Sequence, residues 1–229
     1  MAPRHTRPLL AGSLVLAGVL TLGCNPIAVP YFLMFGLEPK IDPPCRLAAP
    51  DKNREVRVMV LASSALETRP EFLRVERELA SLLVRQLEKG FLQNKERVSV
   101  LPVSRVEKFK DEHPNWQVLS AQEIGQHFGA DYVIDLEIHA LSLYEKGSFN
   151  TFYRGHAEIS VAVIDVHKPG EEPIFKDEYV IDYPRTSGPI PADGGHSLQQ
   201  FRQAFLNRVA TDLSWYFTSH KVEDDFRRE

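Results

Sequence analysis

In the first half of the chain, hydrophobic residues follow two patterns: continuous runs that are typical of strands and a spacing that is typical of a helix. β-branched and other apolar residues dominate 56–62 and 98–102, as is typical of buried strands. Between them, apolar residues recur at steps of three and four through 72–87, which indicates a helix that packs on one face. We expect this helix to begin at Pro70 and to end at Gly90. A strand, a helix and a strand in this order predict parallel pairing through a right-handed crossover.

Farther along, apolar and polar residues alternate, which predicts strands with one buried face. This pattern covers 130–144 and 152–166, and a tight turn at Lys146-Gly147 joins the two stretches into a hairpin. In this register both apolar faces coincide. The turn sets Ile134 against Ile159 and Leu136 against Ala157. Residues 174–183 predict a third antiparallel strand.

Three capping boxes predict the remaining helices. They are Ser104 with Glu107, before a helix that stops ahead of Pro114; Ser120 with Glu123, before one that ends at Gly129; and Ser197 with Gln200, before a closing helix. The expected fold class is therefore α/β (α+β), with a mixed sheet built as strand-helix-strand, then an antiparallel meander, and a closing C-terminal helix.

Proline content suggests how the chain is organised. We expect a signal peptide in 1–23, a proline-rich tether in 24–54, a single α/β domain in 55–220 and a frayed tail in 221–229. The tether includes the apolar stretch 31–37. Two alternatives are left open for this stretch: it contacts a membrane or a partner, or it packs on the domain.

The leader combines a cationic start at Arg4 and Arg7 with the apolar run 9–22, which is too short for a comfortable membrane span. Residues 20–24, LTLGC, resemble the bacterial lipobox, with Thr21 where leucine is usual. The resemblance implies cleavage after Gly23 and a lipid anchor, with palmitate among its acyl chains, on Cys24. The alternative is an ordinary signal peptide and a disulfide between Cys24 and Cys45.

The formal net charge is −4, and loss of residues 1–23 removes two arginines and no acid, which leaves −6. Basic residues are spread among acidic ones. Nucleic-acid binding usually requires a basic face, so we expect no nucleic-acid partner.

Residues 121–138, AQEIGQHFGADYVIDLEI, resemble a superfamily of envelope lipoproteins. It includes the curli secretion channel lipoprotein, the peptidoglycan synthase activator lipoprotein and the amino-terminal domain of the Tol periplasmic protein. The resemblance implies a noncatalytic interaction domain held to a membrane by lipid. Gly129, Ala130 and Asp131 are explained by the local turn without a ligand.

Only the outer face of the hairpin gathers candidate chemistry. The expected register sets Asp135 opposite Glu158, Glu137 opposite His156, and His139 opposite Arg154. An arginine among the ligands and simple alternation favour a solvated strand over a zinc site. We therefore predict no catalytic, cofactor or metal site, and a hydrolase with a noncanonical site on these residues is the third hypothesis for function.

Partner binding is the first hypothesis. The protein is expected to act as an adaptor, activator or assembly component through an envelope protein, with a membrane contact through the lipid anchor. The second hypothesis is an oligomeric outer-membrane secretion pore, and a homo-oligomer is left open. We expect a periplasm-facing protein of the bacterial envelope, and Asn25 after Cys24 favours the outer membrane.

Overall fold

The computed structural model describes residues 40–51, 53–64, 72–168, 170, 172–195 and 197–221. The chain divides into two units, Met1–Pro39 and Lys40–Glu229, and all described residues belong to the second. The predicted lipidation site Cys24, the apolar stretch 31–37 and the predicted helix start Pro70 lie outside the described residues.

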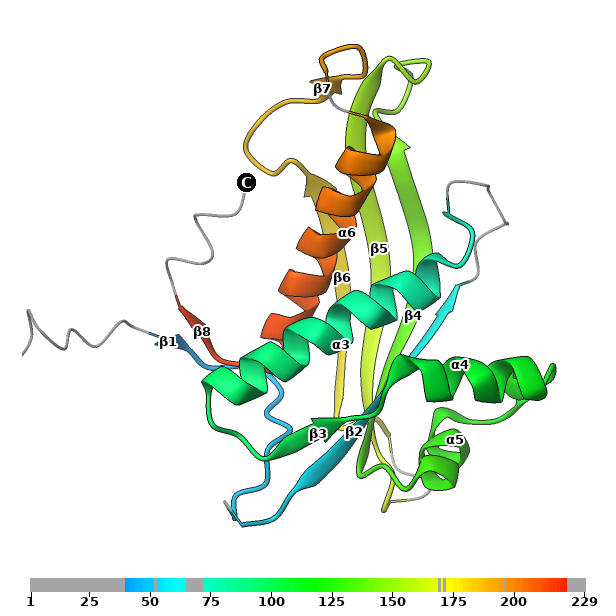
Figure 1. The fold of residues 1–229 in the computed structure, drawn as a ribbon, viewed down its shortest axis with the longest axis vertical. Helices are drawn as coiled ribbons and strands as arrows, with labels where there is room; N and C mark the ends of the chain where they lie inside the picture. The colour runs from blue at the N-terminus through cyan, green and yellow to red at the C-terminus, as the bar shows by residue number, and fades with distance from the viewer. Residues whose placement is uncertain are drawn as a thin grey trace, which may run out of the picture. The chain divides into compact units, whose positions relative to one another are not determined.

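A mixed sheet forms the centre of the domain, with strand order β3-β2-β4-β5-β6 (Figure 1). β2 pairs in parallel with β3 and β4, while β4, β5 and β6 form an antiparallel meander. This confirms the predicted fold class. The bounds are β2 Val56–Ser64, β3 Val98–Val100, β4 Tyr132–Tyr144, β5 Phe152–Asp165 and β6 Phe175–Tyr183, with the short β7 Ile190–Pro191 paired to the start of β5.

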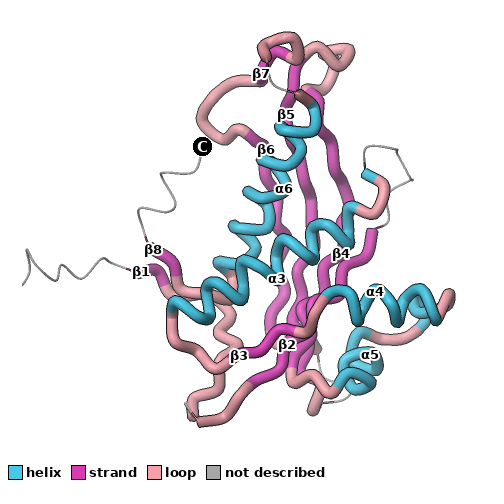
Figure 2. Tube along the Cα trace, viewed as in Figure 1, coloured by secondary structure: helices cyan, strands magenta, loops and turns pink. Residues whose placement is uncertain are grey.

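Two layers of helices pack on the sheet (Figure 2). α3, Val75–Gln93, and the closing helix α6, Leu198–Trp215, share one large core with the sheet. α4, Val103–Glu112, and α5, Ala121–Phe128, pack on the other face in a smaller core, with the 3₁₀ turn Trp116–Val118 between them. The smaller core reaches Val133 of β4 and Ile164 of β5, so it covers only one end of these strands.

Two glycines let the helical layer approach closely. A Cβ on Gly155 of β5 would lie 2.5 Å from the ring of Phe205 in α6, and one on Gly90 of α3 would lie 2.7 Å from Thr218. The helix α3 continues past Gly90 to Gln93, so the prediction that Gly90 ends it is wrong. Gly90 is a packing position and not a cap.

The hairpin of β4 and β5 forms with a different register from the predicted one. Ile134 pairs with Val163 and Leu136 with Val161, four residues from the predicted partners. The connection spans 145–151 in place of a tight turn at Lys146-Gly147. A slip by an even number of residues keeps every side chain on the same face, so alternation alone could not detect it.

Two of the three predicted capping boxes are confirmed. Ser120 caps α5 together with Glu123, and Ser197 caps α6 together with Gln200. The box at Ser104 is wrong, since α4 begins at Val103 after Pro102 and no side chain caps it. This helix does stop before Pro114, at Glu112.

Residues before β2 pack on the domain. β1, Lys40–Ile41, pairs with β8, His220–Lys221, and the backbone N–H of Cys45 donates to the carbonyl of Tyr216. Leu47 is buried in the large core. Cys45 is a buried free thiol, and burial raises its pKa to about 11. Part of the segment 24–54 therefore contacts the domain from Lys40 onward.

Candidate functional site

Beyond the smaller core, one face of β4, β5 and β6 carries polar side chains, and we call this the open sheet face. Val133 and Ile164 still lie under α4 and α5, but the next residues along each strand on this side are polar or small. The polar members are Asp135, Glu137, His139, Arg154, His156, Glu158, Ser160, Lys176, Glu178 and Asp182. They comprise five carboxylates and two permanently charged cations, so the surface is acidic.

All the candidate residues predicted for the hairpin lie on this face, but the predicted pairs are wrong. Glu137 lies opposite Ser160, and Asp135 lies opposite Ala162. A bulge at His139 shifts the remaining pairs, so Ala140 lies opposite Glu158. The seven-residue connection, which the sequence pattern did not reveal, accounts for the four-residue difference.

One hydrogen-bonded chain crosses all three strands. His139 Nε2 lies 2.6 Å from Ser160 Oγ, which donates to Glu178 Oε1 at 2.6 Å. Glu137 Oε1 lies 3.9 Å from His139 Nδ1. A nucleophilic serine must give its proton to the imidazole, whereas here the hydroxyl proton points to Glu178. The geometry is that of a paired surface chain and not of an activated serine.

A second cluster surrounds His156. Its Nδ1 lies 2.9 Å from Asp182 Oδ1, and its Nε2 lies 3.0 Å from Glu158 Oε1. Desolvation lowers the pKa of His156, but the hydrogen bonds and charges of the two carboxylates outweigh it and raise the pKa above its usual value. Within the described residues, no three His, Cys, Asp or Glu side chains converge closely enough to hold a metal ion.

Asp135 marks the border between the small core and the open sheet face. Burial raises its pKa to about 6, the charge of Glu137 adds to the rise, and Lys110 opposes it. Lys110 is held by the carbonyl of Ala62 at 2.7 Å and by Glu107 at 3.0 Å. The alternating sequence gives no sign of this burial, because it depends on where α4 packs.

Asp131, at the start of β4, has a structural role. It accepts the N–H of Arg57 at 2.8 Å, the guanidinium of Arg54 at 2.9 Å and a ring nitrogen of His167 at 2.9 Å. Desolvation raises the pKa of Asp131, but these hydrogen bonds together hold it below the usual value. The carboxylate thus ties the beginning of β2 to the turn after β5.

The helix side of β6 holds a buried ionic cluster that sequence reasoning missed. Asp212 of α6 lies 3.0 Å from Arg208 Nε, accepts the hydroxyl of Tyr179 at 2.9 Å and contacts Arg185 at 2.8 Å. The side chains of Arg208 and Asp212 are 4% and 5% exposed. Burial raises the pKa of Asp212, and the arginines oppose this. The spacing of Arg208 and Asp212, four residues apart on a helix, was the only signal.

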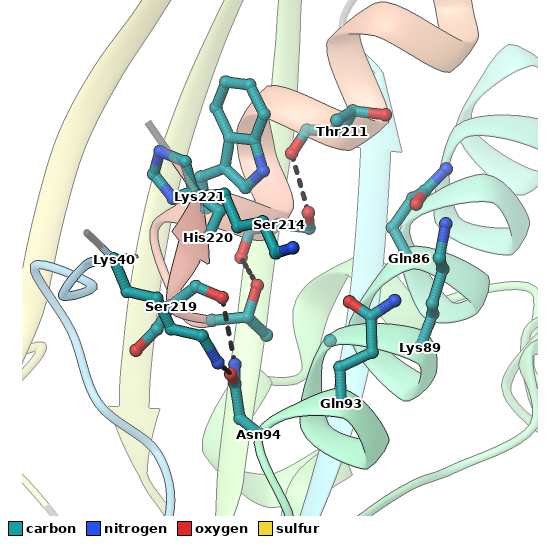
Figure 3. Close-up of a pocket in the computed structure, with 13 residues that line it drawn as sticks. Lys40, Gln86, Lys89, Gln93, Asn94, Thr211, Ser214, Ser219, His220 and Lys221 are labelled. Atoms are coloured by element: carbon teal, nitrogen blue, oxygen red, sulfur yellow. Dashed lines mark hydrogen bonds between the residues drawn. The ribbon is translucent and has the colours of Figure 1, made fainter. Parts of the chain in front are cut away.

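A polar cavity of about 430 Å³ lies between the C-terminal ends of α3 and α6 and the strands β1 and β8 (Figure 3). We call it the lysine pocket. Lys89 reaches it from α3, while Lys40 and Lys221 lie on the opposite side. Lys40 Nζ donates to Asn94 Oδ1 at 2.9 Å, and the ring of His220 stacks on Trp215 at a centroid distance of 4.2 Å. Sequence reasoning did not find this site, since its residues come from three distant segments, Lys40, 86–94 and 211–221.

The predicted lipidation site Cys24 lies outside the described residues, so its lipid attachment stays a prediction. In the part of the chain that the structure describes, no helix is long and apolar enough to cross a bilayer.

No protein-family model and no curated protein sequence matches this chain. Solved structures with a similar fold include the following three. The PelC dodecamer from Paraburkholderia phytofirmans has 11% identity over 77% of this chain and 95% of its own, with a TM-score of 0.40. Lipoprotein GNA1162 from Neisseria meningitidis has 13% identity over 68% and 98%, with a TM-score of 0.38. The LpoB C-terminal domain from Salmonella enterica has 15% identity over 55% and 82%, with a TM-score of 0.27.

The solved structures with a similar fold thus include bacterial lipoproteins. Identities of 11–15% and TM-scores below 0.5 transfer neither a function nor a partner to this chain.

Proposed function

We propose that this is a noncatalytic protein of the bacterial envelope, lipid-anchored at Cys24 and facing the periplasm, that acts by binding another envelope protein. In this role it is an adaptor, an activator or an assembly component. The leader with LTLGC supports the anchor, and Asn25 favours the outer membrane. The open sheet face supports the mode of action.

The acidic character of the open sheet face is the observation that carries the proposal. Three antiparallel strands present five carboxylates there, and the side chains of Glu137, Glu158 and Asp182 are about half exposed. The histidines are occupied by neighbouring hydroxyl or carboxylate groups. A broad charged surface of this kind gives specificity and fast association with a protein of opposite charge. We therefore expect the partner to present a basic surface.

Site-specific photocrosslinking in membranes tests this mode of action. A photoreactive residue at Val180, which is 60% exposed at the edge of the open sheet face, should give a discrete adduct. The same residue at Leu92, which is 80% exposed on α3, should not give that adduct. The charge reversal E137K/E158K/E178K should abolish the adduct because it removes the acidic surface.

A matched charge reversal elsewhere, E88K/D111K/E112K, should leave the adduct unchanged, since these residues lie on α3 and α4. An adduct that survives the first triple variant, or is lost equally in both, contradicts binding through the open sheet face. For the anchor, Cys24→Ala should leave an unprocessed or soluble protein. A variant that stays membrane-bound and correctly cleaved contradicts lipidation.

A further inference from the structure

Strand β6 forms one edge of the sheet. It lies beside β5, and among the described strands it pairs with β5 alone (Figure 1). β6 has nine residues, whereas β3 at the opposite edge of the sheet has three. An edge strand presents a row of backbone N–H and carbonyl groups that can pair with another chain. The long edge of β6 is therefore a place where a further strand can be added.

The backbone of β6 points alternately toward β5 and away from it. Val163 lies opposite Phe175, and its carbonyl faces β6 because it accepts the N–H of Ile174 at 2.8 Å. Hydrogen-bonded pairs alternate along an antiparallel ladder, so the odd-numbered residues of β6 bond to β5 and the even-numbered residues point outward. In agreement, the N–H of Glu178 donates to the side chain of its own neighbour, Asp177 Oδ1, at 2.9 Å.

The four outward-pointing residues are also exposed through their side chains. They are Lys176, Glu178, Val180 and Asp182, all on the open sheet face. Val180 is a large apolar residue that is 60% exposed. Lys176 makes no salt bridge within the described part of the chain. The edge thus carries apolar surface and a free cation next to its outward backbone groups.

The charges along this edge are complementary to those of a second copy of the chain. A two-fold axis sets the same strand of two copies antiparallel to itself. With Tyr179 on the axis, Lys176 of each copy lies opposite Asp182 of the other, and Glu178 lies opposite Val180. Outward-pointing residues then face outward-pointing residues, as the ladder requires. Opposite charges directly across two strands stabilise their pairing.

Other registers of the same pairing are less favourable. A shift of two residues moves the axis to Glu178, which then faces its own copy, or to Val180, which sets Glu178 against Asp182 twice. Like charges directly opposite destabilise a sheet. A shift of one residue sets outward backbone groups against residues that bond to β5. Only the first register pairs the strand from end to end, with Phe175 opposite Tyr183.

We propose that two copies of this chain associate through antiparallel pairing of their β6 strands, with Tyr179 at the two-fold axis. A cavity of about 460 Å³ lies beside the axis on the helix side and is lined by Tyr179, Val180, Ile41 and Pro44. The second copy covers this partly apolar cavity. The open sheet faces of both copies stay exposed on one side of a continuous sheet, so the pairing does not depend on the proposed function.

Disulfide formation between copies tests the register. The variant E178C/V180C of the full-length protein sets cysteines opposite each other at a Cα distance of about 5.5 Å, which a disulfide can span. Mild oxidation in neutral detergent should give a linked dimer on a non-reducing gel. E178C alone and V180C alone report the two shifted registers, and each should give at least tenfold less dimer. The wild-type chain gives the background from its own two cysteines.

Charge exchange tests the ion pairs across the axis. In the E178C/V180C background, K176D and D182K should each lower the dimer yield at least fivefold, because each sets like charges opposite each other. K176D/D182K exchanges the two charges and should restore the yield to within twofold. The control K146D changes an exposed lysine in the connection between β4 and β5, and should leave the yield within twofold. Circular dichroism confirms that all variants fold.

Three results would overturn the pairing of β6 strands. They are a dimer yield at the wild-type background, equal yields in the double and single cysteine variants, and a loss with K176D that K176D/D182K does not restore. None of them affects binding of an envelope protein by the open sheet face. In the photocrosslinking experiment at Val180, an adduct of two copies has twice the mass of the chain, which distinguishes it from an adduct with an envelope protein.

Discussion

Strand β6 carries charged and polar networks on both of its faces, and the two differ in their surroundings. On the helix side, Tyr179 reaches Asp212, which is paired with Arg208 beneath α6. On the open side, Glu178 accepts from Ser160, and Asp182 contacts His156. The contact distances are similar, between 2.6 and 3.0 Å. The burial of the two carboxylates differs, since the side chain of Asp212 is 5% exposed and that of Asp182 is 54% exposed.

This contrast shows that contact distance alone does not determine how much an ion pair contributes to the stability of the fold. Removing one partner of a buried pair leaves a desolvated charge, which costs about 3–5 kcal/mol. Exposed pairs typically contribute about 0–1 kcal/mol because water and salt replace the lost partner. The helix side is therefore expected to determine stability, while the open side is available for binding.

The largest effect is expected for Asp212→Ala. It leaves Arg208 buried without its carboxylate and removes the acceptor of Tyr179, so the free energy of unfolding should fall by about 3–5 kcal/mol. Urea unfolding measures this change. Glu178→Ala on the open side should cost less than about 1 kcal/mol.

A double replacement sharpens the first prediction. R208M/D212L removes both buried charges and keeps apolar volume, so it should recover most of the loss that Asp212→Ala causes. A double variant as unstable as the single one, or an Asp212→Ala loss no greater than that of Glu178→Ala, would contradict the idea that an unpaired buried charge dominates.

The helix side also depends on close packing at Gly155. A methyl group there would meet the ring of Phe205 at 2.5 Å, so Gly155→Ala should lower the free energy of unfolding by about 1–3 kcal/mol through overpacking. Thermal or urea unfolding measures this. Gly188→Ala is the matched control, because nothing lies within 4 Å of its Cβ position. Equal effects at the two glycines would show that the contact with Phe205 is not tight.

Much of the fold was predictable because it depends on local patterns. Alternation identified which side chains of β4 and β5 share a face, and two capping boxes located the starts of α5 and α6. The hairpin register was not predictable in this way, since a four-residue slip leaves the alternation unchanged. The role of Gly90 as a packing position was not predictable either, because its neighbour Thr218 is 128 residues away in the chain.

The sites show the same division. Six of the polar residues of the open sheet face, those from Asp135 to His139 on β4 and from Arg154 to Glu158 on β5, were found because they alternate with apolar ones. Ser160 and the polar residues of β6 were not identified. The buried pair of Arg208 and Asp212 was missed, since opposite charges four residues apart on a helix are usually solvent-exposed. The lysine pocket was missed because its three segments, Lys40, 86–94 and 211–221, meet only in the folded protein. Tertiary packing, and not local sequence, assembles both.

The pH dependence of stability at Asp135 tests the border between the smaller core and the open sheet face. Its pKa of about 6 exceeds the usual 3.8, so between these values the folded protein binds more protons than the unfolded one. Stability therefore falls as pH rises from 4 to about 6, and the penalty is present in full above pH 7. Asp135→Asn lacks this titration, so its stability relative to the wild type should rise by about 2 kcal/mol between pH 4 and pH 7.

Urea unfolding at pH 4, 5, 6 and 7 gives this difference directly. Glu137→Gln should reduce the slope, because the charge of Glu137 contributes to the raised pKa of Asp135. A constant difference between Asp135→Asn and the wild type across this range would show that Asp135 ionises as freely as an exposed carboxyl.

The smallest effect is expected for His156 on the open sheet face. Its raised pKa means that the protonated ring is stabilised by Asp182 and Glu158. This stabilisation is present in full below the unfolded pKa of about 6.5 and is lost as pH rises through the higher folded value. His156→Gln should therefore cost less than about 1 kcal/mol at pH 5.5, because the ring is exposed enough for water to screen the pair, and almost nothing at pH 9.

A double-mutant cycle with Asp182→Asn isolates this pair from other titrating groups. The coupling energy of His156 with Asp182 should be measurable at pH 5.5 and vanish at pH 9. Coupling that persists at pH 9 would mean that the neutral imidazole is held equally well. A coupling of several kcal/mol would contradict the contrast between the faces of β6, because an exposed pair would then matter as much as the buried pair of Arg208 and Asp212.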